Sequence, residues 1–149
     1  MRIPFSLFFF FLLLSSFASA NDKDLQDKDL QILSKRLVSQ LQRCEGIKER
    51  AAVAKQFSNQ TDEHVDGDKI YKYISEHLQQ AAGSPLKIDG SSKKQLKLKL
   101  LSSRKEEHGR FLSNYSLLSE LILEDGQVSC KGSVAYRKQG RIKAAAEHK

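Results

Sequence analysis

Apolar residues spaced three and four positions apart constrain the fold of this chain more than any other feature. One stripe runs from Leu30 to Cys44, a second from Ile70 to Ala81, and a third from Phe111 to Ile122. This recurrence is typical of helices that bury one face. Helix-forming residues also continue from Ile47 to Phe57. We therefore predict a mostly α fold with about three amphipathic helices.

A second pattern, with a period of two, occurs in the C-terminal half. Leucines at 96, 98 and 100 alternate with Lys97 and Lys99, which would place leucines and lysines on opposite sides of a strand. Leu86 and Ile88 precede the turn residues 89–92, which suggests a hairpin. The segment 128–136 also alternates, apart from a glycine. These segments predict a short two-stranded β element, so an α+β fold is the alternative.

The first twenty residues have the features of a secretory signal. Arg2 precedes an apolar run at 5–14, and Ala18-Ser19-Ala20 resembles a signal peptidase site. We predict removal of residues 1–20, a single helical domain at 21–136 and a basic polar tail at 137–149. The protein is then expected to be secreted, lumenal or periplasmic, with no transmembrane span after cleavage. An uncleaved membrane anchor is the alternative.

The chain has two cysteines, Cys44 and Cys130. An oxidising compartment favours joining them, so we predict one disulfide; two buried thiols are the alternative. Two sequons, at Asn59 and Asn114, would accept glycans if the source is eukaryotic.

Acidic residues at 62–68 resemble the start of a calcium-binding loop, but the twelfth position holds Tyr73 where a glutamate is required. We instead predict that Asp66 or Asp68 caps the following helix. The cysteines form no C-x-x-C motif, so neither zinc binding nor redox catalysis is indicated. No metal or cofactor is predicted.

A catalytic site is not apparent. His77 lies within the apolar stripe of the second helix, and Glu76 and Tyr73 are its neighbours. Histidine can act as a general base near neutral pH, which makes these three the best available candidates. No serine or cysteine nucleophile stands at a recognisable spacing, so a structural histidine at the edge of the core is preferred.

Charge is distributed unequally along the chain. Residues 21–68 hold eight Lys or Arg and ten acids, whereas residues 69–149 hold sixteen and eight. A basic surface attracts anions, but it also serves solubility alone. The candidate anion-binding residues are Lys93, Lys94, Lys97, Lys99, Arg104, Lys105, Arg137, Lys138, Arg141 and Lys143.

Three functions are consistent with these features. The first is a small secreted or lumenal helical protein that binds another protein without catalysis. The second is a binder of anionic glycans or membrane surfaces through the basic C-terminal half. The third is an enzyme without a recognisable motif. Nucleic acid is not expected as a partner, because no binding motif for it is present and the chain is expected to be exported.

Overall fold

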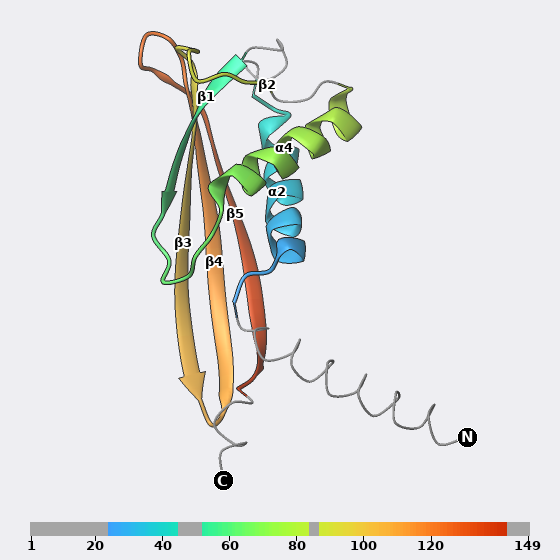
Figure 1. The fold of residues 1–149 in the computed structure, drawn as a ribbon, viewed down its shortest axis with the longest axis vertical. Coiled ribbons are helices and arrows are strands. Elements are labelled where there is room, and N and C mark those ends of the chain that lie inside the picture. Colours follow the sequence, from blue (N-terminus) through green and yellow to red (C-terminus); the bar gives the residue numbers. More distant parts are fainter. Residues whose placement is uncertain (1–23, 45–51, 84–86, 143–149) are drawn as a thin grey trace, which may run out of the picture.

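The structure is a computed structural model, and it describes residues 24–44, 52–83 and 87–142. Its centre is a five-stranded mixed sheet with two helices, α2 (Asp27–Leu41) and α4 (Gly67–Ala82), on one side of it (Figure 1). The strands follow the order β2 (Lys87–Ile88), β1 (Ala52–Asn59), β3 (Gln95–Glu107), β4 (Arg110–Ile122) and β5 (Val128–Arg141). The other side of the sheet carries neither helix.

The predicted mostly α fold is wrong, because strands dominate the described chain and only two helices flank them. The third predicted helix, from Phe111 to Ile122, is the central strand β4. Its leucines lie on both sides of the strand, so its apolar residues fit a helical spacing as well as a strand spacing. Pairing with β3 and β5 on its two edges decides the conformation, and most of the paired residues lie well outside one helical turn of each other in the sequence.

The first two apolar stripes are helical, as predicted. Leu33 and Leu37 of α2 and Ile70 and Ile74 of α4 have no solvent exposure. The Asp66 side chain caps α4 by accepting a hydrogen bond from the Asp68 N–H at 3.0 Å. Asp66 is thus one of the two residues predicted for this role.

The predicted extension of helix through Ile47 to Phe57 is also wrong where it can be compared. Residues 45–51 lie outside the described chain, but Ala52–Asn59 forms β1, which is paired on both edges. Alanine, lysine and glutamine favour helix locally. Parallel pairing with β2 and β3 outweighs that preference, as tertiary context commonly does.

The alternating segment at 95–101 is a strand, as expected, and it continues to Glu107. Leu96, Leu98 and Leu100 are fully buried beneath the helices. The expected hairpin between Ile88 and this strand is wrong, because β2 instead pairs in parallel with β1. β3 pairs along its other edge with β4, which follows it after a two-residue turn at His108 and Gly109.

The expected strand at 128–136 is confirmed as β5, and it reaches Arg141. Five residues assigned to the polar tail therefore belong to the sheet. β3, β4 and β5 extend beyond β1 and both helices, forming a three-stranded arm (Figure 1). β1 pairs with β3 only as far as Leu100, so β3 has a partner on one edge alone from Leu101 onward. The predicted signal at 1–20 lies outside the described residues.

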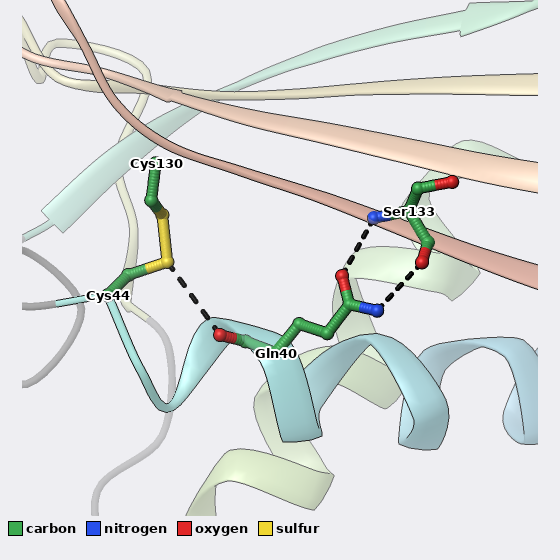
Figure 2. Close-up of a disulfide and its surroundings, with 4 residues drawn as sticks. All are labelled: Gln40, Cys44, Cys130 and Ser133. Carbon is green, nitrogen blue, oxygen red and sulfur yellow. Dashed lines mark hydrogen bonds between the residues drawn. A yellow bond between two sulfur atoms is a disulfide. The ribbon is translucent and has the colours of Figure 1, made fainter.

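The disulfide between Cys44 and Cys130 is present, as predicted, and joins the segment after α2 to β5 (Figure 2). Beside it, the Gln40 side chain accepts a hydrogen bond from the Ser133 N–H and donates one to the Ser133 carbonyl, both at 2.7 Å. The Arg36 guanidinium donates to the Ala135 carbonyl at 2.6 Å. Side chains of α2 therefore satisfy backbone hydrogen-bonding groups on the outer edge of β5.

Candidate functional site

The candidate functional site is the side of the sheet opposite α2 and α4, here called the open face. It is defined by alternate residues of three strands: odd-numbered residues of β3, even-numbered residues of β4 and odd-numbered residues of β5 from 131 to 141. The register pairs these residues directly, for example Lys97 with Glu120 and Glu120 with Lys131. Their neighbours in sequence, such as Leu96 and Leu121, are buried on the helix side.

The open face is strongly basic. Among the described residues of β3, β4 and β5 it holds two acids, Glu107 and Glu120. Its cations are Lys97, Lys99, Lys105, Arg110, Lys131, Arg137 and Arg141. Within the described chain, the salt bridges of 4 Å or less involve other cations, and the seven outnumber the two acids of the face.

The cations form two groups separated by small and apolar side chains. Lys97, Lys99 and Lys131 lie near the β1 end of the sheet, and the other four lie on the arm. Between them the register aligns Leu101 with Ser116, and Ser116 with Ala135. The facing members of the two groups on β3, Lys99 and Lys105, are six residues apart, which corresponds to roughly 20 Å. The open face is therefore charged at both ends and only weakly polar in the middle.

The predicted anion-binding residues are divided by the fold. Lys97, Lys99, Lys105, Arg137 and Arg141 share the open face. Lys93 and Lys94 precede β3. Lys143 lies outside the described residues. The sequence prediction omitted Lys131 and Arg110. Strand pairing alone places these two residues on the open face.

Arg104 and Lys138 lie on the helix side, where they bind acids of this chain. The Arg104 guanidinium is 3.3 Å from carboxylate oxygens of both Asp24 and Glu63. The Lys138 ammonium is 2.8 Å from a carboxylate oxygen of Asp29, which is fully buried. These two cations are therefore occupied internally and are not candidates for a ligand.

The carboxylates of this internal network are well supplied with donors. Glu63 accepts hydrogen bonds from the Tyr115 hydroxyl and, at 2.6 Å, from the Leu25 N–H. Burial and the neighbouring Glu63 raise the pKa of Tyr115 to about 12. The Tyr136 hydroxyl donates to Asp29 at 2.6 Å, and this bond together with burial raises the pKa of Tyr136 to about 12. Both tyrosines stay protonated at neutral pH, which suits a structural network.

The three catalytic candidates do not converge. Tyr73 is buried in the core, Glu76 is exposed, and His77 is half-buried on α4. Glu76 lines a pocket of about 360 Å³ with Ser75 and other residues, but neither Tyr73 nor His77 is among its described lining residues. No described hydrogen bond or ion pair links the three side chains. In the described chain, no group of three or more His, Cys, Asp or Glu side chains is placed to hold a metal ion.

The two sequons occupy different environments. Asn59 is exposed, but its side chain donates to the Glu63 carbonyl at 2.8 Å and accepts from the Thr61 hydroxyl at 2.6 Å. Asn114 lies on the open face and accepts a hydrogen bond from Arg137 at 3.2 Å. A glycan at Asn114 would cover part of the open face.

Comparison with known proteins defines no family for this chain. No family model matches it, and no curated protein matches its sequence. One similar solved structure is the lipoprotein GNA1162 from Neisseria meningitidis, with 8% identity and a TM-score of 0.42. The match covers 60% of this chain and 83% of that one. So low a similarity supports no statement about function.

Two further observations concern location. The disulfide indicates an extracellular or envelope environment, because such bonds persist in oxidising compartments. Neither helix within the described ranges is long and apolar enough to cross a bilayer.

Proposed function

We propose that this chain is a non-catalytic binding protein, secreted, lumenal or periplasmic, whose open face binds an acidic partner protein. The observation that carries the proposal is the group of seven cations, against two acids, on the sheet face opposite α2 and α4, with no salt bridge of 4 Å or less among the described residues. Complementary charge accelerates and orients association between proteins. The half-exposed Leu101 and Leu118 add apolar surface that a protein partner can cover.

The helices are less suited to partner binding. Their apolar stripes are already packed against each other and against the sheet, with Leu33, Leu37, Ile70 and Ile74 fully buried. A partner would therefore meet mainly their polar sides. This arrangement favours the open face over the helices as the binding surface.

The anionic glycan or membrane surface is the second candidate, because it would use the same charges. The layout of the face favours a protein. A polyanion is best matched by a continuous track of cations, whereas here Leu101, Ser116 and Ala135 interrupt the charge between the two basic groups. Small and apolar side chains in the middle of a charged patch are typical of a protein interface, with its less polar centre and polar rim.

Site-specific crosslinking in the native host tests this function. A photoreactive amino acid at Ser116, in the middle of the open face, should capture a defined acidic protein, whereas the same group at the exposed Lys35 of α2 should not. The captured protein is then purified, and its Kd is measured for wild type and for Lys97→Gln/Lys99→Gln at low and high salt. We expect weaker binding for the variant and steep weakening by salt, because exposed charges are screened.

Three outcomes would contradict the proposal. Crosslinking only at Lys35 would place the partner on the helices. Affinity that is unchanged by both salt and substitution would leave the basic face as a solubilising surface. Retention of wild type on anionic vesicles or heparin, lost in the variant and without a protein partner, would favour the second candidate.

A further inference from the structure

A pocket of about 640 Å³ lies at the end of the arm, around the β3–β4 turn. Its charged lining residues are Lys105, Glu107, Arg110 and Arg141, and Phe111 and Leu112 contribute apolar surface. The volume falls within the usual range for sites that bind small groups, about 300–1,000 Å³. All four charged residues and Leu112 belong to the open face, whereas Phe111 and Gly140 lie on the helix side, so the pocket borders the open face at the tip of the arm.

Two arginines are directly opposed in this pocket. The β4–β5 register pairs Arg110 with Arg141, which places like charges side by side on the same face. Such a pair is destabilising unless an anion lies nearby. Glu107 is opposite Arg110 on β3, but neither arginine is within 4 Å of an acid in the described chain. With Lys105, the pocket holds three cations and one acid.

The strands around the pocket are tied together. His108 and Gly109 form the two-residue turn with positive φ angles of 54° and 71°, as tight hairpin turns require. The Ile142 N–H donates to the Gly109 carbonyl at 2.7 Å, which attaches the end of β5 to this turn. The backbone positions of Arg110 and Arg141 are therefore held side by side before any ligand arrives.

The chemistry of the pocket selects an oxyanion. A guanidinium presents a planar set of N–H donors that matches a carboxylate in two-point hydrogen bonds. The neighbouring Leu112, which lies on the same face, suits a carboxylate carried by an aliphatic chain rather than a free, fully hydrated ion. A glutamate side chain has this composition.

We propose that the pocket between Arg110, Arg141 and Lys105 binds a glutamate carboxylate from an acidic segment of a partner protein. This inference rests on the proposed function and identifies the part of the open face that gives it specificity. Lys97, Lys99 and Lys131 at the other end then contribute general attraction rather than a defined contact.

The test uses the mature protein and a capped hexaglutamate peptide as the probe, with binding followed by amide NMR shifts. Arg110→Gln/Arg141→Gln is compared with Lys97→Gln/Lys99→Gln, which removes the same charge from the same face. We expect the arginine variant to weaken binding about tenfold and the lysine variant at most about twofold, because only the former loses two-point hydrogen bonds. Shift changes should centre on residues 107–111 and 140–142.

A second variant separates charge from geometry. Arg110→Lys/Arg141→Lys keeps both charges but loses the planar donors, so its affinity should also fall several-fold. Circular dichroism and thermal unfolding check that each variant folds.

The outcomes are distinguishable. Equal weakening by the arginine and lysine variants would overturn the pocket while leaving the basic face as the binding surface. A peptide that binds neither wild type nor any variant would count against both proposals. Inorganic phosphate that displaces the peptide at equal concentration would show a general oxyanion site and overturn the assignment to glutamate.

Discussion

At the scale of single residues, the fold depends on a small set of buried polar contacts between distant segments. Asp29 is fully buried near the start of α2 and meets Lys138 and Tyr136 of β5. The Gln26 N–H also donates to its carboxylate at 2.8 Å. No pattern in the sequence pairs residue 29 with residue 138.

Asp29 makes stability depend on pH. Burial acts to raise its pKa, but hydrogen bonds from Lys138 and Tyr136 outweigh that effect and hold the pKa below its usual value. A carboxyl whose pKa is lower in the folded state stabilises the fold above its unfolded pKa of about 4 and loses that contribution as the pH falls through the folded value. We therefore expect the free energy of unfolding to decrease below about pH 4.

Urea unfolding of wild type and Asp29→Asn from pH 7 to pH 3 measures this effect. At pH 7 the variant should be less stable by roughly 2–4 kcal/mol, because Lys138 loses its partner in a largely buried position. The difference between the two proteins should shrink in acid. A constant difference over the whole range would show that Asp29 does not contribute to the pH dependence.

At the scale of elements, close packing between α2 and the sheet depends on a glycine in β5. A Cβ at Gly132 would lie 2.6 Å from the Ser119 hydroxyl oxygen, 2.8 Å from Gln40 Oε1 and 3.2 Å from a Leu37 methyl. With glycine at position 132, α2 approaches β5 more closely than a residue with a side chain at that position would allow. The same Gln40 side chain pairs with the backbone of Ser133, so the two contacts define how α2 lies on β5.

Gly132→Ala should consequently destabilise the protein by about 1–3 kcal/mol, the usual range for overpacking. Chemical denaturation measures the loss. Gly90→Ala is the matched control, because a Cβ there meets nothing within 4 Å, and it should change stability little. If Gly132→Ala lowers the free energy of unfolding as little as Gly90→Ala does, α2 can move away from β5 at little cost.

At the scale of the whole molecule, one disulfide joins the segment just after α2 to the edge strand β5. Cys44 and Cys130 are 86 residues apart in the chain, and most of the sheet is formed between them. Closing so long a loop reduces the conformational freedom of the unfolded chain. The bond therefore stabilises the complete arrangement rather than one element.

Replacing both cysteines by alanine should lower the free energy of unfolding by about 2–4 kcal/mol. Denaturation of wild type with and without reductant gives an independent measurement of the same contribution. The reduced wild type and the double variant should agree. A loss below about 0.5 kcal/mol in both would mean that the noncovalent contacts already hold α2 on β5.

The sequence by itself determined the features that depend on short segments. The α2 and α4 stripes, the helix cap and the alternation of Leu96 with Lys97 each need only a few neighbouring residues. Each was predicted, the cap as either Asp66 or Asp68. The disulfide was also predicted, since two cysteines in a chain that is expected to be exported allow a single intramolecular pairing. The terminal expectations, including the signal at 1–20, stay predictions.

Only the tertiary structure decided the rest, because strand pairing joins residues far apart in the chain. The segments 52–59 and 110–122 have residues that suit a helix, and they become strands through hydrogen bonds to partners that no local pattern identifies. The same pairing sends Arg104 and Lys138 to the helix side, where acids of the chain neutralise them, and brings Arg110 beside Arg141. The sequence shows which residues are basic. Which cations pair with acids of the chain and which lie on the open face depends on the alternation of side chains across the sheet.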